Sequence, residues 1–143
     1  MENSSVANVI CRSLILPPNL LMVGGSFMAN CSIAEAVSFP EGFIGTTGGN
    51  FIWDYKGGDV ILPSTVTKLI GNGNFGYIRQ NTRVIIRATT PPELSGTSYI
   101  NASGNYKVNF YVPDAAFADY QSAATWSTYY GYGRVHKMSE LTE

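Results

Sequence analysis

The chain has 143 residues and a formal net charge of −1, which fits a single domain. Charged residues make up only 13% of the chain. No basic cluster is therefore available to neutralise phosphates, so nucleic acid is not an expected partner. The 15 glycines, 7 prolines and 13% aromatic residues favour many short strands and turns over a helical bundle.

The apolar runs argue against membrane insertion, and the first residues argue against a secretory leader. The longest apolar run, LILPPNLLMV, is too short to span a bilayer and contains prolines. The start, MENSSVANVI, is polar and lacks the basic segment of a signal peptide. If Met1 is the native start, this favours a virion protein. If the chain is trimmed from a precursor, we expect an extracellular location on the cell surface.

Three segments repeat one short strand pattern, SLILPPNL, AVSFPEGF and DVILPSTV. Their prolines, Pro17, Pro40 and Pro63, are evenly spaced along the chain. A proline that follows alternating apolar residues ends a strand, because it cannot donate to the ladder of hydrogen bonds. A second motif, GGSF, GGNF and NGNF, follows each strand, and its phenylalanines are evenly spaced with a slightly longer step. We interpret the two motifs together as a structural repeat of roughly 23 residues.

The alternation within each repeat predicts which side chains face inward, because successive residues of a strand point to opposite faces of its sheet. The predicted core spine consists of Leu16, Phe27, Phe39, Phe51, Leu62, Phe75 and Ile85. The predicted outward positions on the same strands are Ile15, Ser38, Ile61 and Val84.

One repeat cannot cover its own apolar face, whereas stacked repeats bury a continuous core. The sequence therefore predicts a repeat solenoid. Its strands would form one short parallel β-sheet, joined by irregular, turn-rich return segments, with a capping helix at the C-terminal end.

The stretch LIGNGNFGYI contains Gly71, Gly73 and Gly76, which match the G-x-G-x-x-G pattern of dinucleotide-binding loops. That motif requires a helix directly after the glycines, and the next apolar run begins at Val84. The two earlier copies, GGSF and GGNF, lack the full pattern. We therefore interpret the glycines as a structural turn, and we expect no bound cofactor.

The C-terminal segment predicts a strand, a helix over residues 115–124 and a tail. Asp114 follows a proline, and its carboxylate is suited to cap the helix N-terminus. Phe117, Tyr120 and Ala124 share one helical face that could cover the end of the sheet, with Trp126 as a plug.

The motifs LPSTVTKLIGNGNFGYI, VIIRATTPPEL and FMANC resemble the BspA-like leucine-rich repeats of gut bacteria. The ending NFYVPDAAFADYQSAATWSTYYGYGRVHKMSEL resembles the terminal cap of that family. The resemblance implies a right-handed leucine-rich-repeat solenoid and an inward-facing Cys31. It divides the chain into an N-terminal extension or partial repeat over 1–10, repeats over 11–107 and a cap over 108–143.

The sequence offers little catalytic chemistry. His136 is the only histidine and lies in the C-terminal tail, and no nucleophile motif accompanies it. One histidine with Cys11 and Cys31 does not make a zinc cluster. The two thiols are interpreted as unpaired, and a single bridge between them is the alternative. We therefore expect no catalytic residues and no metal site.

The remaining candidates are surfaces. Trp53 and Tyr55, and also Tyr129, Tyr130 and Tyr132, are residue types that favour partner contacts. Packing within the fold is the alternative explanation for these aromatic residues. Together with the outward strand residues they form the candidate partner-binding surface.

The leading hypothesis is a non-enzymatic binding or structural module that presents a repeat surface to a protein or glycan on a bacterial cell surface. The alternative is a structural, decoration or host-attachment protein of a bacteriophage virion, with other virion subunits as partners. A hydrolase is a weaker alternative, and an oligomer is compatible with the apolar outward residues.

Overall fold

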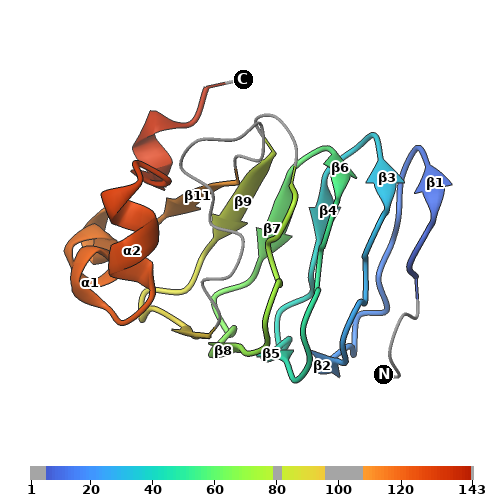
Figure 1. Cartoon of the computed structure of the whole chain (residues 1–143), viewed down its shortest axis with the longest axis horizontal. Coiled ribbons are helices and arrows are strands. Elements are labelled where there is room, and N and C mark those ends of the chain that lie inside the picture. Colours follow the sequence, from blue (N-terminus) through green and yellow to red (C-terminus); the bar gives the residue numbers. More distant parts are fainter. Residues whose placement is uncertain (1–5, 79–81, 96–107, 143) are drawn as a thin grey trace.

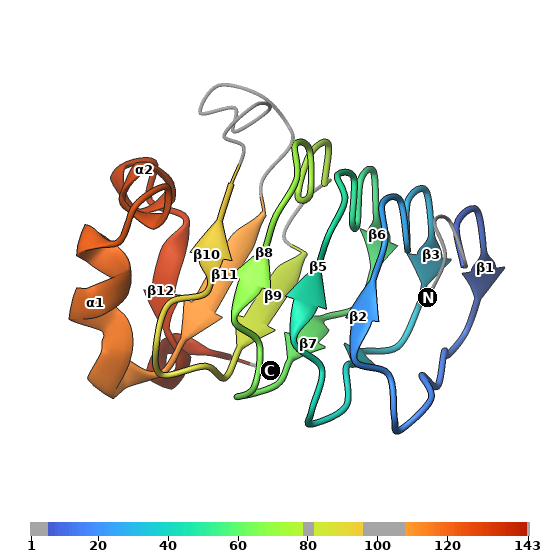
Figure 2. The same ribbon diagram turned by 90° about the horizontal axis from the view of Figure 1, so that it is seen from below.

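The computed structural model describes residues 6–78, 82–95 and 108–142. Its strands form three parallel sheets (Figures 1 and 2). The three-stranded sheet has the order β1 (Ile10–Cys11), β3 (Ser32–Ile33) and β6 (Lys56–Gly57). The four-stranded sheet has the order β2 (Met22–Val23), β5 (Gly45–Thr46), β8 (Lys68–Leu69) and β10 (Glu93–Leu94). The five-stranded sheet has the order β4 (Val37–Ser38), β7 (Val60–Leu62), β9 (Arg83–Ile86), β11 (Asn109–Val112) and β12 (Val135–Lys137).

The repeat in the sequence determines how these strands pair. Ser32 aligns with Ile10, and Val60 aligns with Val37, so each strand pairs with its counterpart in the preceding repeat. Main-chain hydrogen bonds also join the turns between strands, such as the 2.8 Å bond from the Met28 amide to the Phe51 carbonyl. Equivalent positions of successive repeats therefore lie side by side, as the spacing predicted.

The predicted fold class, a right-handed leucine-rich-repeat solenoid with one short sheet, is wrong. The segments expected to return irregularly are themselves extended, and they pair into two further parallel sheets. With helices at one end and parallel strands elsewhere, the fold is of the α/β type. Strands such as β3 and β5 have only two residues each. Such strands are too short to show an alternation of apolar and polar residues, so the sequence pattern could not predict them.

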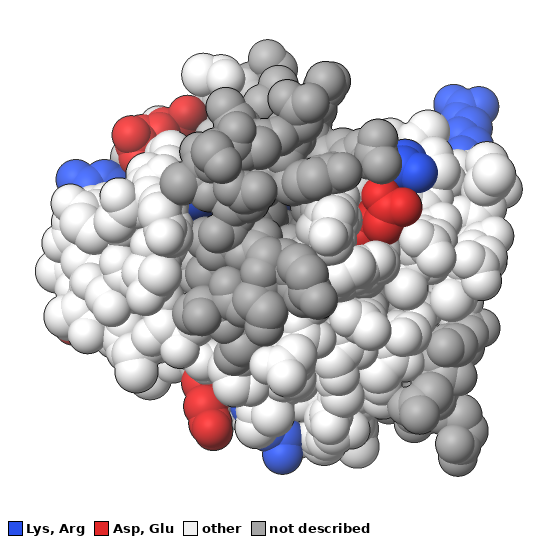
Figure 3. Space-filling view, viewed as in Figure 1, with Lys and Arg blue, Asp and Glu red and all other residues white. Residues whose placement is uncertain are grey.

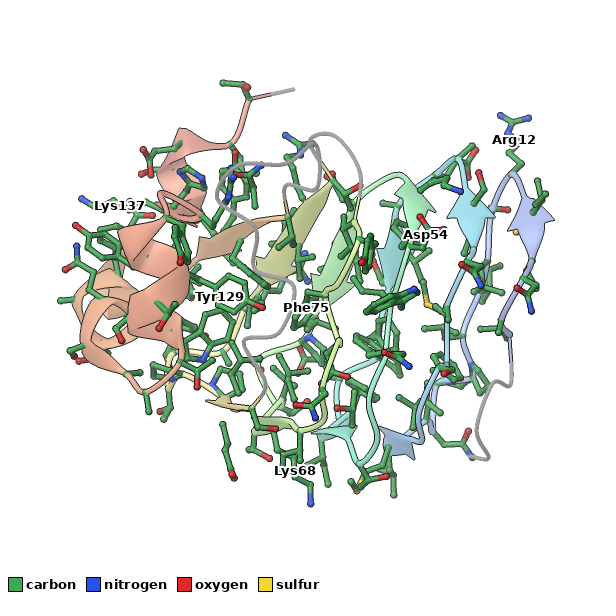
Figure 4. The ribbon with its side chains drawn as sticks, in the orientation of Figure 1. Arg12, Asp54, Lys68, Phe75, Tyr129 and Lys137 are labelled. Carbon is green, nitrogen blue, oxygen red and sulfur yellow. The ribbon has the colours of Figure 1, made fainter. Side chains whose placement is uncertain are left out.

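The interior is a line of aromatic rings that runs through the stacked repeats. Phe39 contacts Phe51 at 5.4 Å between ring centroids, Phe75 contacts Phe110 at 5.0 Å, and Phe110 contacts Trp126 at 5.0 Å. The labelled Phe75 points into this interior in Figure 4. The predicted core positions that are buried are Leu16, Phe27, Phe39, Phe51, Leu62 and Phe75.

Ile85 is the exception in the predicted spine, because the fourth strand is shifted by one residue. The proline spacing pairs Ile85 with Leu62, whereas in the structure Val84 aligns with Val60, and both of these valines are fully buried. Ile85 consequently aligns with the outward Ile61. The predictions that Ile85 faces inward and Val84 outward are both wrong. The step from Val60 to Val84 is the longer one that the phenylalanines follow.

The glycines of LIGNGNFGYI lie where a side chain would overlap the preceding repeat. Gly71 has a φ of +125°, and a Cβ atom there would lie 2.4 Å from the backbone of Gly48 in the preceding repeat. Gly76 leaves room for the indole of Trp53, which a Cβ atom would approach to 2.7 Å. Between Gly76 and β9, the described residues contain no helix. The interpretation as a structural turn accounts for all of these contacts.

The C-terminal segment covers one end of the sheets with helices (Figures 1 and 2). A 3₁₀ turn over Asp114–Ala116 leads into α1 (Phe117–Ser122), and α2 (Trp126–Gly131) follows. The chain then returns to the five-stranded sheet as β12 and ends in a second 3₁₀ turn, Met138–Glu140. No helix among the described residues is long and apolar enough to cross a membrane.

Several details of this cap differ from the prediction. The single helix expected over residues 115–124 is interrupted, because Ala123 is extended and Thr125 has a φ of +69°. Asp114 does not cap the helix and instead accepts a 3.0 Å hydrogen bond from the Ser139 amide. Trp126 is fully buried, as expected of a plug, and its Nε1 donates a 2.8 Å hydrogen bond to the Pro92 carbonyl.

Candidate functional site on the outer face of the five-stranded sheet

The outward side chains of the five-stranded sheet form one row across its strands. Ser38 aligns with Ile61, Ile61 with Ile85, Ile85 with Tyr111, and Tyr111 with His136. None of the five is buried. We call this row, Ser38, Ile61, Ile85, Tyr111 and His136, the outer row. Because neighbouring strands lie about 4.8 Å apart, the outer row is about 19 Å long.

The chemistry changes along the outer row. Its centre is aliphatic, at Ile61 and Ile85. At one end, Tyr111 and His136 stack with their ring planes inclined by 28° and their centroids 5.1 Å apart. The Nε2 atom of His136 also lies 3.0 Å from the Oδ1 atom of Asn109, which holds the imidazole in place.

The ion pair between Arg83 and Asp59 lies beside the outer row, because each residue stands two positions before a row residue on the same strand or at its start. The guanidinium of Arg83 donates two hydrogen bonds to the Asp59 carboxylate, from Nε at 2.9 Å and from Nη2 at 2.8 Å. These bonds raise the pKa of Arg83. Arg83 also donates to the Thr142 carbonyl, which ties the last described residue to the sheet. The border is therefore charged but internally neutralised.

Charge is sparse on the face shown in Figure 3. The Lys, Arg, Asp and Glu side chains visible there lie singly or in small groups among uncharged atoms. Apolar and hydrogen-bonding contacts are therefore the means of recognition that this surface offers, rather than long-range charge attraction.

The structure brings together only part of the predicted partner-binding surface. Ser38 and Ile61 lie in the outer row as expected. Val84 is fully buried beneath the row. Ile15 is 92% exposed, but it lies between β1 and β2 and belongs to none of the three sheets.

The two aromatic residues of FIWDYKGG pack within the fold. The hydroxyl of Tyr55 donates a 3.4 Å hydrogen bond to the Ile33 carbonyl, and its ring is fully buried. Trp53 is half-buried, packs over Gly76 and contacts Tyr77 at 4.5 Å between ring centroids. Packing, the alternative given for these residues, is what the structure shows.

The tyrosines of the cap divide between core and surface. Tyr129 is buried against Phe110, with ring centroids 5.0 Å apart, and it points inward in Figure 4. Tyr130 and Tyr132 are exposed, and Tyr130 contacts Phe117 at 6.0 Å. Tyr130 lies in α2 and Tyr132 directly follows it, so neither belongs to the outer row of the sheet.

The sequence patterns do not identify the second half of the outer row. The proline spacing predicts Ile85 in the core and His136 in the C-terminal tail, and no pattern distinguishes Tyr111. The charged residues on either side of VII, Arg83 and Arg87, carried the signal, because an inward Ile85 would turn both of them toward the core.

The described residues contain no group of three or more His, Cys, Asp or Glu side chains that could hold a metal ion. Cys11 and Cys31 are free thiols, and burial raises the pKa of Cys31. A shallow hollow of about 320 Å³ is lined mainly by hydroxyl side chains such as Thr65, Thr67 and Thr89.

Comparison of the sequence with known proteins does not assign the chain to a family. The chain matches no protein-family model, and no curated protein sequence matches it. The resemblance to BspA-like leucine-rich repeats therefore stays a prediction based on the quoted motifs.

Proposed function

We propose that this chain is a non-enzymatic binding module that docks a protein partner on the outer row. The observation that carries the proposal is the alignment of Ile61, Ile85 and Tyr111 across three paired strands. An aliphatic centre with an aromatic residue and a polar border matches the usual anatomy of a protein interface. Tyrosine is also among the residue types that dominate binding energy.

The strands beneath the row favour binding without rearrangement. Ile61, Ile85 and Tyr111 stand on strands that are paired on both sides, and the inward residues beneath, such as Val60, Val84 and Phe110, are fully buried. A surface already ordered before binding loses little conformational entropy when a partner docks.

A protein fits this surface better than a glycan does. A sugar ring stacks on an open aromatic face, whereas one face of Tyr111 lies against the His136 imidazole. The aliphatic centre offers no hydrogen bonds to sugar hydroxyls. A bacterial cell surface, which the family resemblance implies, is the setting we propose.

Photo-crosslinking tests the proposal directly. A photoreactive amino acid would replace Ile85 in one variant and the exposed Thr90 in a control variant. We expect a specific protein adduct from position 85 and none from position 90 after illumination in extracts of the source cells. Equal adducts from both positions would overturn the proposal. Binding of the chain to glycans on an array through Tyr111, in place of a protein, would also overturn it.

A further inference from the structure

The outer face of the five-stranded sheet carries an arginine on each side of the outer row. Along β9, Val84 and Ile86 are buried, so the alternation of the strand places Arg87 on the same face as Ile85. The Arg87 amide donates a 3.0 Å hydrogen bond to the Leu62 carbonyl, so the pairing of the sheet continues to this residue. Arg87 is exposed and stands just beyond the outer row.

Arg134 stands on the other side of the row. It comes directly before β12, and its carbonyl accepts a 2.8 Å hydrogen bond from the Phe110 amide. Because Val135 is buried, the alternation of β12 places Arg134 on the same face as His136. The Arg134 side chain is half-buried on this face.

The two arginines lie on a diagonal across the row. Ile85 aligns with Tyr111, and Tyr111 aligns with His136, so Arg87 and Arg134 are two strands and four residues apart. With the usual strand spacing and rise per residue, their Cα atoms are about 16 Å apart, and Tyr111 lies between them. We call Arg87 and Arg134 the flanking arginines.

Neither flanking arginine forms an ion pair with a residue in the described part of the chain, where the ion pairs use Arg12, Lys56 and Arg83. In the register of the sheet, Arg87 lies between Pro63 and Pro113, and Arg134 lies beside Asn109. None of these neighbours is charged. The Asp59 carboxylate, which borders the same row, is already bound by Arg83.

The flanking arginines restrict which proteins can dock on the row. A partner that covers the row removes water from them, and a charge that loses its water without gaining a counter-charge opposes binding. A carboxylate compensates for this loss, because it accepts two parallel hydrogen bonds from one guanidinium. These ion pairs act at contact distance, so they add to the apolar contacts of the row without a strong long-range field.

We propose that the protein docked on the outer row presents Asp or Glu carboxylates to Arg87 and Arg134, on either side of an apolar segment. This inference rests on the function proposed for the outer row and adds the chemistry of the partner. An extended segment spans the distance between the flanking arginines in about five residues. Nucleic acid does not fit as well, because two cations this far apart neutralise too few phosphates.

Peptide selection tests the inference. A yeast-displayed library of random peptides is selected for binding to the natural chain and against binding to Ile85→Asn, which removes the apolar contact without adding charge. The retained peptides should be rich in Asp and Glu around an apolar centre. A synthetic peptide from this set should bind Arg87→Gln and Arg134→Gln at least about tenfold more weakly than the natural chain. Lys68→Gln removes the same charge from the four-stranded sheet (Figure 4) and should leave the affinity unchanged.

Replacing the acidic residues of the peptide by Asn and Gln should abolish the difference between the natural chain and the two arginine variants. Circular dichroism of both variants should match that of the natural chain, because neither arginine is buried. Retained peptides without enrichment in acidic residues, or equal affinity for the arginine variants, would refute the acidic partner and leave the outer row as the docking surface. A selection that yields no Ile85-dependent peptide would overturn the docking surface itself, and this inference with it.

Discussion

Tyr111 of β11 stacks against His136 of β12, with ring centroids 5.1 Å apart. Both helices of the cap lie between these two strands in sequence, so the cap both covers one end of the sheets and returns a strand to the outer row. The outer row, which we propose as the binding surface, and the cap are therefore parts of one structure. Damage to the cap should disturb the outer row as well.

Trp126→Ala should destabilise the protein by about 3–5 kcal/mol, because it leaves a large cavity in the core. It also removes the 2.8 Å hydrogen bond from the indole to the Pro92 carbonyl. Urea unfolding measures the loss. Tyr132→Ala, at an exposed position, should stay within about 0.5 kcal/mol of the natural protein. Equal stability of the two variants would contradict the role of Trp126 as a plug.

Gly71→Ala should destabilise the protein by about 1–3 kcal/mol or more, since a positive φ disfavours alanine and the added Cβ meets Gly48. Gly131→Ala is the matched control, because nothing lies within 4 Å of its added Cβ. It should be neutral or slightly stabilising. Thermal unfolding of both variants measures the difference, and a Gly71→Ala protein as stable as the control would show that the repeats pack less closely.

Alkaline pH should destabilise the fold through three tyrosines. Burial raises the pKa of Tyr55, Tyr120 and Tyr129. Their contribution is complete below the ordinary tyrosine pKa of about 10. Above it, the unfolded chain ionises first, and the free energy of unfolding falls by about 1.4 kcal/mol per pH unit for each residue.

Tyrosinate absorbance and urea unfolding at the same pH values test this expectation. Tyr129→Phe should reduce the slope of stability against pH, because it removes one of the three buried hydroxyl groups. If all tyrosines ionise near the ordinary pKa while the protein remains folded, the three rings are not buried as described.

The Cys31 thiol should react only when the protein unfolds. Its side chain is fully buried, burial raises its pKa, and its Sγ lies 2.8 Å from the Val6 carbonyl. In a Cys11→Ser variant, a disulfide reagent should modify the remaining thiol at the rate of unfolding. Modification as fast as that of a small thiol free in solution would instead place Cys31 at the surface.

The sequence predicted the inward side of the molecule better than the outward side. Proline and phenylalanine spacing identified the repeat and core residues such as Phe39 and Phe75, because burial demands large apolar side chains at fixed intervals. One extra residue before Val84 moves the strand by one position, so Val84 faces inward and Ile85 faces outward. Proline spacing could not reveal this shift, since no proline directly follows that strand.

The two additional sheets could not be predicted from side-chain patterns. Strands such as β5 and β6 are two residues long, and one of the two is glycine. Their pairing uses main-chain groups that every residue carries. β12 was missed for a different reason. Its single inward residue, Val135, gives too short a pattern to separate a strand from a tail.

The affinity of the crosslinked protein for outer-row variants tests the central claim most directly. Isothermal titration would compare the natural chain with Ile85→Lys and with Thr90→Lys, which adds the same charge on an exposed turn. We predict that Ile85→Lys weakens binding by about 2 kcal/mol or more, roughly thirtyfold, and that Thr90→Lys has no effect. Unchanged affinity of Ile85→Lys, with its fold intact, would contradict the assignment of the outer row as the binding surface.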